Sequence, residues 1–263
     1  MTQQLTRDDG LAGKVALISG GASGIGRALA IAYARAGVTS VIGHYPGDPH
    51  DPEETVAGVR EAGGCCEVVE VCVRDTAQVD NFAREAVERC GRLDIAVAAA
   101  GILRKASLPD LTDEAWEDML QVDLGGVMRV FRSAVRYMTH GGSMVAVSSI
   151  AGGVYGWGHH THYAASKAGV MGITRSLAVE LAGQGIRVNT VVPGLIRTPQ
   201  SLDAENSLGE EGLQDAGRLI PAGRVGTDDE AARVIRFLTS DDAAYITGQE
   251  LVVDGGLTIQ WPS

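Results

Sequence analysis

The sequence predicts an α/β protein: one doubly wound domain of about seven parallel strands with helices on both faces. Short apolar runs alternate with amphipathic helical patterns from residue 14 to residue 253, which is typical of a parallel sheet covered on both faces. A glycine-rich turn joins the first apolar run to the first helical pattern. No internal repeat, low-complexity tract or linker divides the 263 residues, so we expect a single domain.

The elements follow in order along the chain. The polar stretch 1–11 is expected to be a loose N-terminal tail. Strands are predicted at 14–19, 40–43, 67–73, 95–98, 143–147, 187–192 and 250–253. Helices are predicted at 27–36, 52–62, 76–90, 112–138, 162–182 and 227–239. Asp75 with Gln78, and Thr227 with Glu230, are typical capping pairs at the start of two of these helices.

Composition limits the classes of function. A formal net charge of −11 argues against nucleic acid or an anionic membrane as a partner. No apolar run approaches the length of a membrane span and no secretory leader opens the chain, so we expect a cytoplasmic protein with reduced cysteines. His159, His160 and His162 lie too close together in a glycine-flanked loop to be a dependable ligand set, and no metal is predicted.

The segment 20–26 is the first candidate site. It reads Gly-Gly-Ala-Ser-Gly-Ile-Gly and lies between a predicted strand and a predicted helix. Such a turn lets backbone amides approach a pyrophosphate at the positive end of the helix. A plain tight turn is the alternative, but the flanking strand and helix favour nucleotide binding.

The segment 148–169 is the second candidate site. Tyr163 and Lys167 lie four residues apart on a predicted helix, so their polar ends lie side by side. An ammonium beside a tyrosine favours the phenolate, and lowering its pKa from about 10 by three units requires roughly 4 kcal/mol. With Ser149 as a hydrogen-bond donor, the three form an acid/base device for a hydroxyl or carbonyl group. An exposed tyrosine and lysine on an ordinary helix are the alternative.

From residue 11 to the C-terminus the sequence resembles the short-chain dehydrogenase/reductase family. The matching motifs are Ser19-Gly20-x-x-x-Gly24-Ile25-Gly26, Ser149 with Tyr163-x-x-x-Lys167, Pro193-Gly194-x-Ile196-x-Thr198, and Val253-Asp254-Gly255-Gly256. The resemblance implies one dinucleotide-binding (Rossmann) catalytic domain over residues 1–263. It also implies hydride transfer between C4 of a nicotinamide and a carbonyl or carbinol carbon. Tyr163 would be the general acid/base and Ser149 would hold the substrate oxygen, while Lys167 would bind the ribose and keep the tyrosine acidic.

The resemblance further implies which residues bind the dinucleotide. They are Gly20, Ser23, Gly24, Ile25, Gly26, Tyr45, Cys72, Val73, Ala99, Gly101, Tyr163, Lys167, Pro193, Gly194, Ile196 and Thr198. Two departures from the family pattern fall in this set. Ala98-Ala99-Ala100-Gly101 stands where members usually carry Asn-Asn-Ala-Gly, and we expect the main chain to compensate. Cys72 replaces an aspartate that binds the adenine amino group, which should weaken adenine recognition modestly.

A third departure touches the chemistry. In Val122-Asp123-Leu124 an aspartate replaces an asparagine whose backbone carbonyl, in the family, kinks the helix and holds a water that links the lysine to solvent. An ionised Asp123 would oppose a phenolate on Tyr163, yet it would pair with Lys167. We include Asp123 among the catalytic candidates and favour the interpretation in which its side chain points away or simply substitutes for asparagine.

Cofactor choice depends on the segment 43–48, which follows the second strand. Tyr45 occupies the position where NAD-using relatives carry an acidic residue for the ribose 2′-hydroxyl. No lysine or arginine follows until Arg60, so a 2′-phosphate has no obvious cation. We predict NAD rather than NADP.

Together these observations predict an NAD(P)-dependent short-chain alcohol dehydrogenase or carbonyl reductase (EC 1.1.1.-) that acts on a small secondary alcohol or ketone. The amphipathic segment 199–226 is expected to be a mobile substrate lid. The family's usual assembly and the tail around Asp254 predict a homotetramer. A dinucleotide-binding regulatory protein whose catalysis has lapsed is the alternative function.

Overall fold

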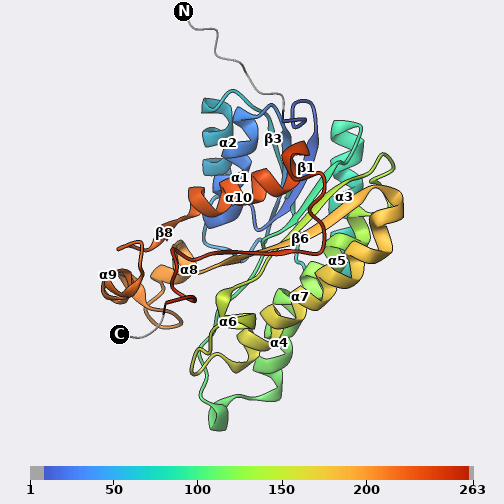
Figure 1. Ribbon diagram of the computed structural model, residues 1–263. Helices are drawn as coiled ribbons and strands as arrows, with labels where there is room; N and C mark the ends of the chain where they lie inside the picture. Colours follow the sequence, from blue (N-terminus) through green and yellow to red (C-terminus); the bar gives the residue numbers. More distant parts are fainter. Residues whose placement is uncertain (1–8, 261–263) are drawn as a thin grey trace, which may run out of the picture.

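A seven-stranded parallel sheet forms the centre of the molecule, in the order β3-β2-β1-β4-β5-β6-β9 (Figure 1). The computed structural model describes residues 9–260. The strands are β1 (Val15–Ser19), β2 (Thr39–His44), β3 (Cys66–Glu70), β4 (Ile95–Ala98), β5 (Gly142–Val147), β6 (Ile186–Pro193) and β9 (Glu250–Val253). All seven predicted strands are confirmed. The order reverses between β1 and β4, which is where doubly wound sheets open a crevice for ligands.

Helices cover both faces of this sheet. They are α1 (Gly24–Arg35), α2 (Pro52–Glu61), α3 (Thr76–Cys90), α4 (Asp113–Asp123), α5 (Gly125–Ala134), α7 (Thr161–Leu181) and α10 (Asp228–Thr239). Helices α1 and α10 lie on one face, and α3, α5 and α7 lie on the other. The predicted doubly wound fold is therefore confirmed.

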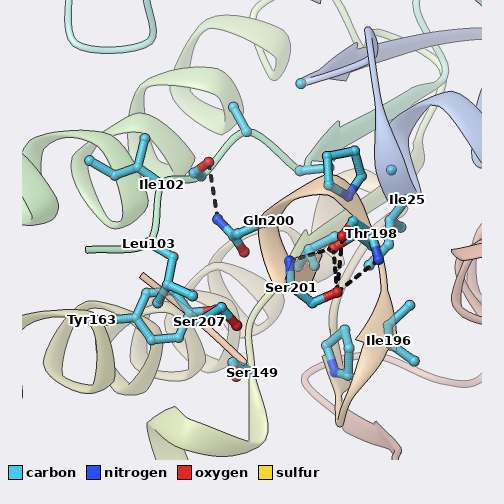
Figure 2. A pocket seen from close by; sticks show the side chains of 18 of the residues that line it. Ile25, Ile102, Leu103, Ser149, Tyr163, Ile196, Thr198, Gln200, Ser201 and Ser207 are labelled. Carbon is cyan, nitrogen blue, oxygen red and sulfur yellow. Dashed lines mark hydrogen bonds between the residues drawn. The ribbon is translucent and has the colours of Figure 1, made fainter. Parts of the chain in front are cut away.

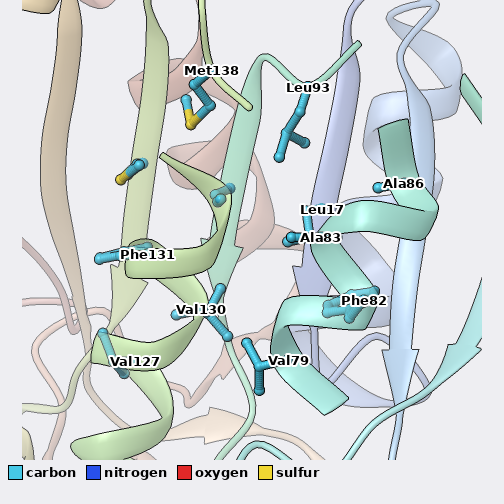
Figure 3. Packing of buried hydrophobic residues seen from close by; sticks show 14 of the residues in the cluster. Leu17, Val79, Phe82, Ala83, Ala86, Leu93, Val127, Val130, Phe131 and Met138 are labelled. Atoms are coloured by element: carbon cyan, nitrogen blue, oxygen red, sulfur yellow. The ribbon is translucent and has the colours of Figure 1, made fainter. Parts of the chain in front are cut away.

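Alternate residues of each strand enter two separate apolar cores. Leu17 packs among α3 and α5, where Phe82 and Phe131 fill the space between helices and sheet (Figure 3). Ile18 points the other way and packs among α1 and α10. Both side chains are fully buried, which explains why the strand is apolar throughout instead of alternating with polar residues.

The predicted single helix over 112–138 is wrong, because two helices occupy that stretch. Helix α4 ends at Asp123, Leu124 has φ −115° and ψ −55°, and α5 starts at Gly125. Gly125 and Gly126 favour helix poorly, so the break falls where propensity is lowest. The capping prediction for Thr227 and Glu230 is confirmed.

The expected loose tail is also wrong for the part that the structure describes. Leu11 is fully buried, and Asp9 forms an ion pair with Arg236 on α10. Residues 1–8 lie outside the described residues.

Several short elements were not predicted. They are α6 (Ile150–Gly153), β7 (Ile196–Arg197) paired with β8 (Gly226–Thr227), α8 (Pro199–Leu202), α9 (Gly209–Leu219), and 3₁₀ turns at Leu108–Asp110, Ala182–Gln184 and Asp241–Ala243. Helices α8 and α9 belong to the segment 199–226, which we call the lid segment. Within residues 9–260, no helix has both the length and the apolar character that crossing a bilayer requires.

Candidate active site

A cavity of about 950 Å³ lies along the carboxyl ends of the strands. Every residue of the predicted dinucleotide-binding set lines this cavity, and so does Ser149. Asp123 is the one candidate that does not line it. The fold thus brings together segments that follow six different strands.

The glycine-rich turn forms one end of the cavity, between β1 and α1. Gly20 has φ +71°, and a Cβ added at Gly26 would lie 2.2 Å from the Gly20 carbonyl oxygen. Only glycine therefore fits at both positions. Ser23 precedes α1 without capping it through its side chain, so first-turn amides remain available to an anion. These features fit a dinucleotide pyrophosphate.

The segment after β4 keeps its shape without the family's asparagines. The Ala100 N–H donates a hydrogen bond to the Ser19 hydroxyl at 3.3 Å. A Cβ added at Gly101 would lie 3.0 Å from Asp123 Oδ2 and 3.3 Å from Lys167 Nζ. The close approach of this backbone to a charged pair accounts for the glycine.

Tyr163 and Lys167 lie one turn apart on α7 and face the same end of the cavity. Both are nearly buried, and Lys167 Nζ lies 5.5 Å from the centroid of the tyrosine ring. The ammonium donates to the Val147 carbonyl at 3.2 Å, at the end of β5. The geometry rules out the alternative of an exposed tyrosine and lysine.

Ser149 lies opposite Tyr163, where β5 leads into α6. Its Oγ accepts a hydrogen bond from the Ala151 N–H at 3.2 Å, which leaves its own O–H able to donate into the cavity. Ser149 and Leu103 lie beside Tyr163 in this part of the cavity (Figure 2).

Asp123 forms an ion pair with Lys167 on the side of the lysine that faces away from the cavity. Its Oδ2 lies 3.0 Å from Lys167 Nζ, and its Oδ1 accepts the Ile102 N–H at 2.8 Å. The carboxylate is fully buried. The interpretation in which Asp123 points away is therefore wrong. Because Asp123 does not line the cavity, it reaches the other candidate residues only through Lys167.

Burial and charge act in opposite directions on Tyr163. Burial raises its pKa, Lys167 lowers it, Asp123 raises it and Ser149 lowers it, and the net pKa lies above the ordinary value. The expected net lowering is wrong, because the sequence reveals the lysine but not the burial or the orientation of the carboxylate. Tyr163 is consequently protonated at neutral pH.

The other two charges of this group shift as well. Burial lowers the pKa of Lys167, but Asp123 and Tyr163 raise it more, so the pKa is raised and the ammonium stays charged. Burial raises the pKa of Asp123, opposed by Lys167 and the Ile102 N–H. We call Ser149, Tyr163, Lys167 and Asp123 the catalytic cluster.

The lid segment contacts the site through hydrogen bonds. Gln200 Nε2 on α8 donates to the Gly101 carbonyl at 3.5 Å (Figure 2). Asn206 Oδ1 accepts the Lys105 N–H at 3.2 Å, and the Asn206 carbonyl lies 3.0 Å from His160 Nε2.

His160 links this lid contact to the start of α7. Its Nδ1 faces the Gly158 carbonyl at 2.8 Å, and its ring stacks on Trp157 with centroids 3.9 Å apart. Both ring nitrogens therefore face backbone carbonyls. Among residues 9–260, no three His, Cys, Asp or Glu side chains are grouped so that they could hold a metal ion.

Sequence reasoning missed several residues that line the cavity near Tyr163. They are Leu103, Tyr155 and Trp157. Two aromatic residues in the glycine-rich loop before Tyr163 were an available signal. Leu103 lies far from any motif, so only the fold places it. Gln200, Ser207 and Leu208 also line the cavity, and they belong to the predicted lid segment.

The segment 43–48 places no free cation at the cavity wall. Tyr45 is half-exposed with its ring against Gly47, and Asp48 Oδ1 lies 2.5 Å from His50 Nδ1. Arg74 lines the same region and pairs with Asp118 at 2.6 Å.

Known proteins resemble this chain over nearly its whole length. The family model described as "Enoyl-(Acyl carrier protein) reductase" matches residues 20–258. The chain is 42% identical over 254 residues to 3-oxoacyl-[acyl-carrier-protein] reductase FabG of Thermotoga maritima, covering 95% of this chain and 99% of that protein. It is 36% identical over 254 residues to 3beta-hydroxysteroid dehydrogenase 1 of Eggerthella lenta, covering 95% and 96%.

Solved structures agree with these matches. A short-chain type dehydrogenase/reductase from Mycobacterium marinum has a TM-score of 0.88 at 31% identity, covering 95% of this chain and 97% of that chain. Levodione reductase has the same TM-score at 31% identity, covering 95% and 99%.

Proposed function

Because the chain belongs to the short-chain dehydrogenase/reductase family, we propose that it is an NAD(P)-dependent oxidoreductase that interconverts a ketone and a secondary alcohol. The observation that carries the proposal is the meeting of Ser149, Tyr163 and Lys167 at one end of the cavity. The glycine-rich turn lines the same cavity. Nothing in this arrangement supports the alternative of a lapsed regulatory protein.

The residues divide the reaction between them. The turn 20–26 and the segment 193–198 would hold a nicotinamide dinucleotide, which would supply or accept the hydride. In the direction of reduction, the protonated Tyr163 hydroxyl gives its proton to the carbonyl oxygen. The Ser149 O–H donates a hydrogen bond to the same oxygen and stabilises the negative charge that develops there. The Lys167 ammonium compensates the charge left on Tyr163.

We propose a ketone or secondary alcohol with apolar neighbouring groups as the substrate. Tyr163 and Ser149 offer two hydroxyl groups to one oxygen atom, which suits a carbonyl better than a carbon–carbon double bond. Leu103, Trp157 and Leu208 line the surrounding wall. The names of three similar proteins, a 3-oxoacyl reductase, a 3beta-hydroxysteroid dehydrogenase and levodione reductase, each refer to a ketone or a carbinol.

We propose NAD as the preferred cofactor. A 2′-phosphate near Tyr45 would lie beside Asp48, while Arg74, an arginine of the cavity wall, is paired with Asp118. An unpartnered phosphate would have to keep its hydration, and this disfavours NADP.

We also propose a homotetramer. Val179 on α7 and Val252 on the edge strand β9, two residues before Asp254, are exposed apolar side chains, which suits contact with another subunit. Sedimentation velocity at micromolar concentration should give a mass of four chains, and a mass of one chain would refute the assembly.

The enzymatic proposal is tested by titrating the protein with NAD and NADP and then screening ketones and secondary alcohols for a change in nicotinamide absorbance. We expect dinucleotide binding and turnover with at least one ketone. Tight dinucleotide binding without turnover of any substrate would favour the lapsed alternative.

A further inference from the structure

The buried ion pair of the catalytic cluster places beside Lys167 a negative charge that a neutral side chain at position 123 could not supply. The Asp123 carboxylate and the Lys167 ammonium are 3.0 Å apart, with side-chain exposures of 0% and 6%. The second carboxylate oxygen is fixed by the Ile102 N–H at 2.8 Å. The carboxylate therefore cannot swing toward solvent without losing both partners.

The position of this pair bears directly on Tyr163. Lys167 is the only cation near the tyrosine among the residues that act on its pKa, and Asp123 neutralises that cation from the side away from the cavity. Charges interact strongly in such a buried setting. A neutral partner would leave the whole positive charge of Lys167 facing the tyrosine.

The other groups around Lys167 and Asp123 add no net charge near Tyr163. Val147 contributes a carbonyl, which holds the ammonium at 3.2 Å. His162 on α7 is buried, and its pKa is lowered by burial and by His160, so it is neutral at pH 7 despite the opposite effect of Asp123. Ser149 adds only a hydroxyl. The charge balance near Tyr163 is thus set by Lys167 and Asp123.

We propose that Asp123 is a positioning residue that orients Lys167 and, by offsetting its charge, keeps Tyr163 in the protonated form into the alkaline range. The inference rests on the proposed function, because it assigns a pH range to the same acid/base group. It makes the enzyme a persistent proton donor whose reduction of ketones continues well above neutral pH.

The direction of the pH dependence follows from the protonation state of Tyr163 that each reaction direction requires. Ketone reduction needs protonated Tyr163, so its rate is constant at low pH and falls as the pH rises through the pKa of the tyrosine. Asp123→Asn removes the negative charge and leaves Lys167 unopposed. The pKa of Tyr163 should then fall, and the decline of the reduction rate should begin at lower pH.

The direct test is an ultraviolet difference titration of tyrosinate on the full-length protein. The signal of Tyr163 is isolated by subtracting the same titration of a Tyr163→Phe version of each variant. We expect Asp123→Asn to titrate at least about one pH unit lower than the unmodified protein, in the range typical of a nearby charge. Asp123→Glu keeps the charge and should titrate with the unmodified protein. Coinciding curves for Asp123→Asn and the unmodified protein would overturn the proposal.

The kinetic test uses NADH and ethyl 3-oxobutanoate as a ketone probe. The alkaline limb of kcat/KM should move down by the same interval in Asp123→Asn, while Glu117→Gln, an exposed change on the same helix, should leave it in place. Asp123→Ser provides a second uncharged variant if the asparagine variant fails to fold, with the same shift expected. A protein that turns over no ketone refutes the proposed function, whereas the tyrosinate titration still decides the role of Asp123.

Discussion

Two ion pairs of the same length occupy very different regions of this molecule. In the catalytic cluster, Lys167 and Asp123 are 3.0 Å apart with 6% and 0% of their side chains exposed. In the lid segment, Arg218 and Asp215 are also 3.0 Å apart, with 79% and 74% exposed. Water screens the second pair almost completely but hardly reaches the first. Two ion pairs of equal length therefore differ in the strength of their electrostatic effect, and burial determines which charges affect the chemistry.

Buried and exposed charges should therefore affect different steps of the reaction. Buried groups of the catalytic cluster should set turnover and its pH dependence. Exposed groups of the lid segment and of the cofactor-binding wall should set affinities, with little effect on the chemical step.

The largest effect is expected from Tyr163→Phe. The change removes only the hydroxyl that exchanges a proton, and general acid/base groups contribute about a hundred- to ten-thousand-fold to rate. Turnover should fall by that amount while dinucleotide affinity, measured by titration, stays close to normal. Tyr155→Phe, an exposed tyrosine lining the same cavity, is the matched control. Turnover within about threefold of normal in Tyr163→Phe would show that Tyr163 is not the general acid/base.

Pro46→Arg tests the cofactor-binding wall. Pro46 is exposed in the turn beside Tyr45, and a guanidinium there can meet a 2′-phosphate with a charge-assisted hydrogen bond. A bond of this kind is worth about 1.5 kcal/mol or more, so affinity for NADP should rise roughly tenfold by fluorescence titration. Turnover at saturation should not change. If the unmodified protein already prefers NADP, the interpretation of segment 43–48 is wrong, and His44 or Arg74 becomes the candidate phosphate contact.

His160→Ala tests the contact between the lid segment and α7. The change removes two hydrogen-bond contacts and the stacking on Trp157. Losing a net hydrogen bond costs about 0.5–1.5 kcal/mol, so the KM for a ketone should rise about threefold to tenfold. Because Tyr163 is untouched, kcat should change less than KM. A loss confined to kcat would place His160 with the catalytic cluster instead.

Asp215→Asn should have the smallest effect. An exposed pair one helical turn apart contributes at most about 0.5 kcal/mol. We expect a Tm change of no more than about 2 °C and unaltered kinetics. A pH–rate profile that moved with Asp215→Asn would contradict the division between buried and exposed charges.

Sequence reasoning succeeded where one local pattern determines the structure. Apolar strands such as Val15–Ser19 are buried on both faces, so their composition alone identifies them. The turn at Gly20 to Gly26 lies entirely within one motif. Thr227 and Glu230 form the predicted capping box because its partners are three residues apart.

It failed where the structure depends on partners far away in the chain. The orientation of Asp123 depends on Lys167 and on the Ile102 N–H, which no periodicity connects. The pKa of Tyr163 depends on burial by residues such as Leu103. The break at Leu124 was hidden because the apolar pattern continues through the two glycines that follow.

The packing of the first helix against the last has a consequence for synthesis on the ribosome. Leu29 and Tyr33 of α1 are fully buried, and the Tyr33 hydroxyl bonds Thr239 of α10 at 2.9 Å across 206 residues of chain. A nascent chain that has reached residue 200 has therefore made every strand of the central sheet except β9, yet it exposes the apolar side of α1. That surface stays uncovered until the final helix emerges, and exposed apolar surface of this kind promotes aggregation. Chaperone binding during translation should accordingly be concentrated in this late interval.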